Sequence, residues 1–123
     1  MLYPFPPRCG SVSPWGAIQT VTPLGPDAVA VTTASHGGLC VSSDALARMP
    51  AAIRQTGYSA NGWFEEDCDW ALPYLALGLD TFEPEPARGP ALRAAAIRTV
   101  RAWHPGHLAL LGLTDEAGEP GHG

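Results

Sequence analysis

Hydrophobic and polar positions follow a two-residue period in the first third of the chain, and this pattern predicts β-strands there. Residues 15–21 are rich in β-forming residues and predict one strand. In residues 28–33, valines alternate with small residues and predict a second strand. Residues 39–42 predict a third strand, and the Ser-His-Gly-Gly segment at 35–38 predicts a tight loop before it. Residues 28–42 are therefore expected to form a hairpin.

The next part of the chain changes to a helical pattern. The Ser-Ser-Asp run at 42–44 offers N-caps for a helix, which Pro50 interrupts before a further turn at 51–55. A longer helix is expected over residues 63–77, because acidic residues fill its first turn, where the helix dipole favours negative charge. Pro73 should kink this helix or end its first half.

A last helix is expected over residues 90–103, since proline suits a first turn and a Pro-Gly pair follows its end. Together these elements predict an α+β fold, in which a small antiparallel sheet of about three strands packs against two or three helices. Residues 1–13 predict an extended Pro-rich arm, and 14–113 a single domain. The Gly-rich, acidic residues 114–123 predict a flexible tail.

The charge balance narrows the classes of function. Of 123 residues, only 15% are charged, and seven basic residues stand against twelve acidic ones, for a net charge of −5. All seven basic residues are arginines, and no stretch is basic enough to follow a phosphate backbone. Direct binding to nucleic acid is therefore not expected. An acidic chain can instead occupy a basic groove on a protein that binds nucleic acid.

Cysteine usage and hydropathy indicate the compartment. The three cysteines, Cys9, Cys40 and Cys68, are odd in number and form no C-x-x-C motif. The first residues lack the charged and apolar regions of a signal peptide. The longest apolar run, 108–113, is far too short to cross a bilayer. We therefore expect a cytoplasmic protein with free thiols and no membrane association.

The acidic segment 63–70 carries the strongest local signal. On the predicted helix, Trp63, Asp67 and Trp70 share one face, which places the Asp67 carboxylate between two indoles. A carboxylate buried there needs hydrogen-bond donors. Three interpretations stay open, namely a carboxylate that serves only the helix dipole or a neighbouring loop, a working acid or base, and a polar interaction patch. The other acidic residues are expected to stay solvated: Glu65, Glu66 and Asp69.

The loop at Ser35, His36, Gly37 and Gly38 is the second candidate feature. Consecutive glycines permit positive φ and a close approach of backbones. A histidine beside such a turn suits general acid–base work, because its ordinary pKa is close to neutral, but it can also simply bond to the backbone. The Gly-Gly pair is not a phosphate loop, because it lacks the following Lys and Ser/Thr and opens no helix.

Metal binding and nucleophilic catalysis are the weaker alternatives. A metal site needs three or four converging ligands, which the sequence spacing does not guarantee. We therefore predict no metal and no cofactor. Cys68 with His36 as its base is conceivable, but Cys68 falls on the apolar side of the predicted helix, where a thiol behaves as a small hydrophobe. The residues that could serve as metal ligands are His36, Glu66, Asp67, Cys68, His104 and His107.

Three motifs together resemble an uncharacterised bacterial domain family that occurs on chromosomes, plasmids and phages. They are Trp-Gly at 15–16, Ser-His-Gly-Gly at 35–38 and Trp-Phe-Glu-Glu-Asp-Cys-Asp-Trp at 63–70. Phe64 stands where the family has Tyr, and Asp69 stands at an Asp or Glu position. The resemblance covers about residues 14 to 80 and implies no known activity. It does imply that the loop and the acidic segment form one unit, and that the protein acts in conflict between mobile elements and their hosts.

Two functions follow as hypotheses. The first is a small acidic interaction protein that binds a basic surface on a host protein complex, such as an inhibitor of the anti-CRISPR or anti-restriction type. The second is a small hydrolase or group-transfer enzyme that uses a His36–Asp67 pair assisted by Glu66. We favour the first, and a homodimer through the weakly charged surface stays open. The predicted binding residues are Ser35, Gly37, Gly38, Trp63, Glu65, Asp69 and Trp70.

Overall fold

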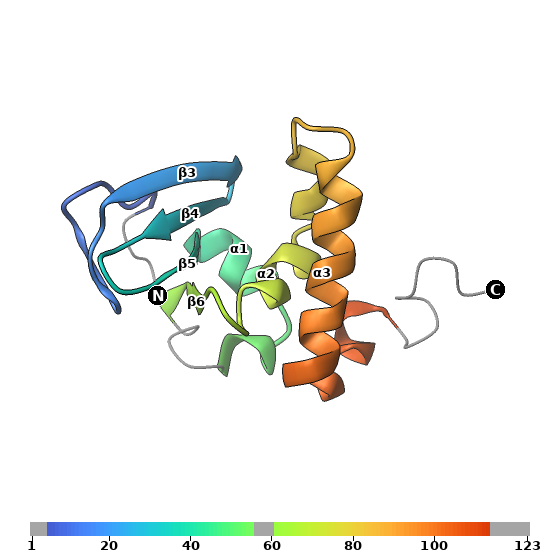
Figure 1. Cartoon of the computed structure of the whole chain (residues 1–123). Coiled ribbons are helices and arrows are strands. Elements are labelled where there is room, and N and C mark those ends of the chain that lie inside the picture. The colour runs from blue at the N-terminus through green and yellow to red at the C-terminus, as the bar shows by residue number, and fades with distance from the viewer. Residues whose placement is uncertain (1–4, 56–60, 114–123) are drawn as a thin grey trace.

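The computed structural model describes residues 5–55 and 61–113, and it contains a four-stranded antiparallel sheet (Figure 1). The strands are β3 (Thr20–Gly25), β4 (Ala28–Thr32), β5 (Gly37–Val41) and β6 (Trp63–Glu65), and they lie in the order β3-β4-β5-β6. The α+β class is confirmed. The sheet is larger than the three strands predicted, because β6 adds an edge that the sequence analysis assigned to a helix.

The predicted helix over 63–77 is wrong in its first half. Trp63 and Phe64 belong to β6, where Trp63 lies opposite Cys40 and Phe64 opposite Leu39 on β5. Phe64 is fully buried, so pairing with β5 gives it a place in the core that an isolated helix start would not. The helix α2 spans only Ala71–Ala76. Pro73 lies in its first turn, where a missing N–H costs no helical hydrogen bond.

The hairpin predicted over 28–42 is confirmed as β4 and β5, in which Val31 lies opposite Gly38 and Thr32 opposite Gly37. The single strand predicted over 15–21 is instead divided. Its first part becomes β2 (Gly16–Ala17), which pairs with β1 (Val12–Ser13), and its last residues open β3. Gly16 has a φ of +117°, which is a conformation that breaks a continuous strand.

The helices follow the sequence signals more closely. Helix α1 (Ser43–Arg48) begins after Ser42, whose hydroxyl accepts a hydrogen bond from the Ala45 N–H at 3.1 Å. Helix α3 (Arg88–Trp103) begins two residues before the predicted start and ends as predicted. The described residues also contain short 3₁₀ helices, which are η1 (Ile53–Gln55), η3 (Leu79–Phe82), η4 (Pro105–His107) and η5 (Ala109–Leu111).

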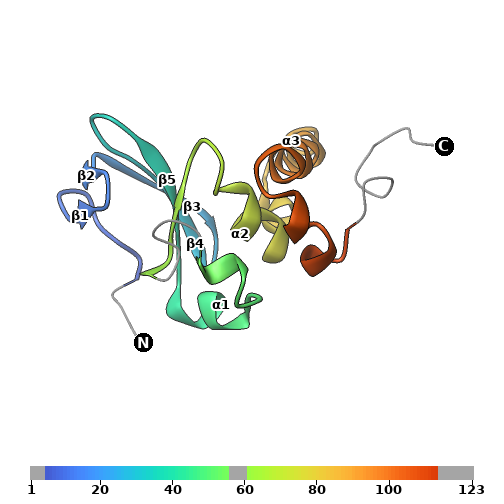
Figure 2. The same ribbon diagram turned by 90° about the horizontal axis from the view of Figure 1, so that it is seen from below.

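Both faces of the sheet are covered, by different parts of the chain. Figure 2 shows the helices on one side of the sheet and the β1–β2 hairpin on the other. The helical side buries Leu39, Val41 and Phe64 with α1, α2 and α3, and α3 packs on α2 and η3. On the other side, Val31 and Cys40 pack with residues that include Phe5, Trp15, Ile18 and Trp63.

The predicted extended arm therefore contributes to the core through Phe5, while the tail predicted at 114–123 lies outside the described residues. Among the helices of the described residues, none has the length and apolar character needed to cross a membrane.

Candidate functional site

The tip of the β4–β5 hairpin holds His36 in a fixed orientation. The His36 N–H donates to the Thr33 hydroxyl at 3.1 Å, and the same hydroxyl donates to the His36 carbonyl at 2.8 Å. The imidazole Nδ1 lies 2.8 Å from the Ser35 carbonyl, which can only accept, so Nδ1 carries the hydrogen. The other ring nitrogen, Nε2, then faces Glu65 Oε2 at 3.3 Å.

This environment favours the protonated imidazole. The Ser35 carbonyl is the largest cause that raises the pKa of His36 above its ordinary 6.5, and loss of solvation opposes it. The carboxylates of Glu65, Asp67 and Glu66 raise the pKa further. Because Nδ1 already donates to the backbone, Nε2 can bond to Glu65 only when it also carries a hydrogen. The pair is therefore strongest in the protonated form.

The two glycines after His36 are required by close contacts, and neither has a positive φ. A Cβ on Gly38 would collide with the Phe64 carbonyl and the indole of Trp15. A Cβ on Gly37 would lie 2.9 Å from the backbone carbonyl oxygen of Val31, which cannot move aside, and 2.9 Å from Glu66 Oε2. Of the two reasons for glycine given by the sequence, close approach therefore applies and positive φ does not.

The register of β5 and β6 brings the acidic segment to this loop. Gly38 lies opposite Glu65, so the end of β6 and the turn after it lie beside His36. One ligand atom from each of His36, Glu65 and Asp67 lies within 4.8 Å of the others. The two segments predicted to meet thus do lie together, although the ion pair of His36 is formed with Glu65. The catalytic and binding roles predicted for these residues remain predictions.

The expected setting of Asp67 is wrong. Residues 66–70 form turns, so Asp67 is an exposed side chain and is not held between two indoles. The ring of Trp63 packs edge-on against Trp15 with 5.8 Å between centroids, and Trp70 packs in the same way against Tyr74 at 5.5 Å. The two tryptophans therefore serve opposite faces of the sheet.

The buried carboxylate of the segment is Asp69, which the sequence analysis expected to be solvated. Asp69 is only 9% exposed, and its Oδ1 lies 2.9 Å from His104 Nε2, at the C-terminal end of α3. Burial of Asp69 is tolerated because this imidazole supplies a hydrogen-bond partner for its carboxylate. No local sequence signal marks this pair, since 35 positions separate the two residues.

Cys68 connects the two histidines into one polar network, defined by His36, Glu65, Cys68, Asp69 and His104. The Cys68 Sγ lies 3.3 Å from Glu65 Oε1 and 3.6 Å from Asp69 Oδ1. Loss of solvation, and then these two carboxylates, raise the pKa of Cys68 to about 12. The free thiol of Cys68 is therefore a poor nucleophile near neutral pH. Glu65 contacts both this thiol and His36, the proposed base.

Two groups of side chains in the described residues could hold a cation. They are Cys68 with Asp69 and His104, and His36 with Glu65 and Asp67; in each, the ligand atoms lie within 4.8 Å of one another. Two of the sequence candidates, Glu66 and His107, belong to neither group.

Comparison with known proteins identifies the chain at the level of a family. No curated protein and no solved structure matches it. A family model described as "Domain of unknown function (DUF7007)" matches residues 8–120, which is most of the chain. The resemblance to an uncharacterised domain family is thereby confirmed, and the protein belongs to the DUF7007 family.

Proposed function

We propose that this protein is a non-enzymatic interaction protein that binds a basic surface of a partner protein. The contact surface is the acidic patch, which we define as Glu65, Glu66 and Asp67 beside His36. The finer form of the proposal is a cytoplasmic inhibitor that occupies the basic groove of a host nucleic-acid-targeting defence complex. The net charge of −5 and the absence of lysine support a basic partner.

The exposure of the patch is the observation that carries the proposal. Glu66 and Asp67 are exposed, so packing of the core does not explain their presence. The His36 side chain is 43% exposed, whereas catalytic groups commonly lie in water-excluding clefts. A cleft of about 340 Å³ is lined by residues of α1, α2 and η5, and His36 does not line it. Exposed charges of one sign instead favour steering toward an oppositely charged surface.

The test compares two variants of equal net charge as bait in host lysate. Glu66→Gln with Asp67→Asn removes two exposed charges from the patch. Asp44→Asn with Glu85→Gln removes two exposed charges elsewhere and is the matched control. Partners recovered by the wild type should be recovered by the control and lost by the patch variant, with the loss mimicked by high salt. Equal recovery by both variants would contradict the proposal.

The same variants test the finer form in living cells. A plaque assay compares phage growth on hosts that carry a CRISPR or restriction system and express each protein. The wild type and the control variant should restore plating, and the patch variant should not. Plating that the wild type never restores on any such host would refute the inhibitor role, while the capture experiment would still test binding.

A second candidate, a small hydrolase or group-transfer enzyme, has one specific observation in its favour. The Ser35 carbonyl orients the His36 ring, and the carboxylates of Glu65 and Asp67 lie beside it. A catalytic histidine needs such an orienting group. If His36→Gln abolishes function in folded protein while the double variant at Glu66 and Asp67 retains it, the enzyme is favoured. Charge reversal at Asp69 is unsuitable for this comparison, because Asp69 is buried.

A further inference from the structure

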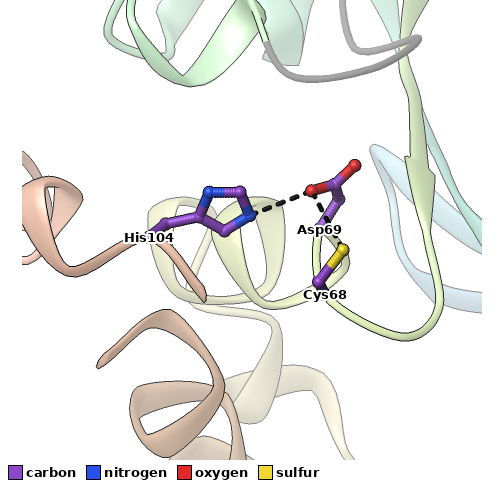
Figure 3. Close-up of side chains that lie close together, drawn as sticks. All are labelled: Cys68, Asp69 and His104. Carbon is purple, nitrogen blue, oxygen red and sulfur yellow. Dashed lines mark hydrogen bonds and ion pairs between the residues drawn. The ribbon is translucent and has the colours of Figure 1, made fainter. Parts of the chain in front are cut away.

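Three metal-binding side chain types converge where the turn after β6 meets the end of α3. Figure 3 shows Cys68, Asp69 and His104 pointing toward one another. Their ligand atoms lie within 4.8 Å of one another, and Asp69 is buried while Cys68 and His104 are partly buried. Cys68 and Asp69 are adjacent in the sequence and supply the sulfur and the carboxylate, whereas His104 supplies the imidazole from the end of α3.

The separations suit a small tetrahedral ion. Zinc bonds of about 2.3 Å to sulfur and about 2.0 Å to oxygen or nitrogen place two ligands about 3.5 Å (sulfur to oxygen) or about 3.3 Å (nitrogen to oxygen) apart. The observed separations are 3.6 Å from Cys68 Sγ to Asp69 Oδ1, and 2.9 Å from Asp69 Oδ1 to His104 Nε2. The imidazole would have to move outward slightly from Asp69 to accept the ion, and the third pair, Cys68 with His104, lies within 4.8 Å.

The thiol hydrogen of Cys68 can serve only one of two neighbouring carboxylate oxygens. The Cys68 thiol has one hydrogen but lies within bonding distance of both Glu65 Oε1 and Asp69 Oδ1. When the thiol hydrogen points at Glu65, the contact with Asp69 Oδ1 at 3.6 Å is a van der Waals contact without a hydrogen bond. A cation that replaces the thiol hydrogen turns that contact into an attraction.

An unmet polar group lies beside the cluster. The ring of His107 packs edge-on against His104 with 5.4 Å between centroids, and its Nδ1 is buried without a hydrogen-bond partner. Buried polar atoms in native proteins normally have a partner. The surroundings of His104 thus contain more polar groups than the described protein atoms satisfy.

We infer that Cys68, Asp69 and His104 form a zinc site, with solvent in the fourth coordination position. A thiolate, an imidazole and a carboxylate are the donors that zinc takes, whereas magnesium and calcium prefer oxygen alone. The bound ion would link the turn after β6 to the end of α3, which are 35 positions apart in the sequence at Asp69 and His104. The inference is independent of the acidic patch and its partner.

The experiment measures zinc on the full chain after removal of metal with a chelator. One equivalent of zinc is added, excess is removed by desalting, and retained metal is counted by mass spectrometry. The wild type should keep about one zinc per chain. With free zinc at a hundred times the dissociation constant, the unfolded fraction should fall about 100-fold, which appears as a rise in Tm.

Cobalt and two cysteine variants identify the ligands. Cobalt bound to the wild type should give the sulfur-to-metal charge-transfer band in the near ultraviolet. Cys68→Ser should lose this band and bind zinc at least tenfold more weakly, while Cys9→Ser, which alters an exposed free thiol, should match the wild type. Asp69→Asn preserves size and should also weaken zinc binding. It is the second test if Cys68→Ser does not fold.

Two outcomes would overturn the inference. One is wild-type protein that retains no zinc after desalting. The other is a Cys68→Ser variant, folded by circular dichroism, whose zinc affinity and Tm shift equal those of Cys9→Ser.

Discussion

Removal of the His104 imidazole tests whether the polar network stabilises the fold. In His104→Ala, the carboxylate of Asp69 stays in place, 9% exposed, without its imidazole partner. A hydrogen bond to a charged group is worth about 1.5–3 kcal/mol, and a broken buried pair costs about 3–5 kcal/mol. The side chains of His104 and Asp69 are 17% and 12% exposed, so water partly replaces the lost partner. We expect a loss of about 2–3 kcal/mol.

The assays are urea unfolding, which measures the free energy, and a thermal melt, which measures Tm, both in the presence of a chelator so that any metal contribution is removed. For a chain of this length, each kcal/mol changes Tm by about 3–6 °C, which gives a decrease of roughly 6–18 °C. His36→Ala is the matched control, since this histidine lies at an exposed hairpin tip, and it should change Tm far less. A loss below about 0.5 kcal/mol in His104→Ala, the range of ordinary surface substitutions, would refute the reasoning.

Three further predictions concern the hairpin and the first helix. In Glu65→Gln, the pKa of His36, measured by NMR titration, should fall toward 6.5 but stay above it, because the Ser35 carbonyl remains. Since the folded-state pKa of His36 is raised, the stability due to this pair is present below pH 6.5 and is lost as pH rises through the folded pKa. If the difference in free energy of unfolding between wild type and Glu65→Gln grows with pH, this sign is wrong. Gly38→Ala should destabilise the fold by about 1–3 kcal/mol in urea unfolding, through the clash with β6, and an unchanged midpoint would contradict that packing. Ser42→Ala should cost about 1 kcal/mol by loss of the cap on α1, and a thermal melt equal to the wild type would exclude the cap.

Elements with local signals were predictable from the sequence. The β4–β5 hairpin combines alternating valines with a glycine turn, α1 has a serine cap, and α3 has a proline in its first turn. Each signal acts within a few residues of the element that it marks, so no knowledge of the tertiary structure is needed.

The segment at 63–70 was mispredicted because its signals conflict. Its two initial aromatic residues fit a strand, while the acidic run that follows fits a helix start, and pairing with β5 decides in favour of the strand. This wrong assignment also made the predicted partner of His36 wrong. Once Glu65 lies opposite Gly38, Glu65 and not Asp67 pairs with His36. The bond from Asp69 to His104 could not be foreseen, because no periodicity relates positions so far apart.

The affinity of the captured partner for the two charge variants tests the central claim most directly. By titration calorimetry at low salt, Glu66→Gln with Asp67→Asn should weaken binding about tenfold, since two lost surface charge contacts amount to about 1.4 kcal/mol. Asp44→Asn with Glu85→Gln should stay within about twofold of the wild type, because general charge effects are small beside direct contacts. Equal dissociation constants for the two variants would show that the patch at His36 is not the binding surface.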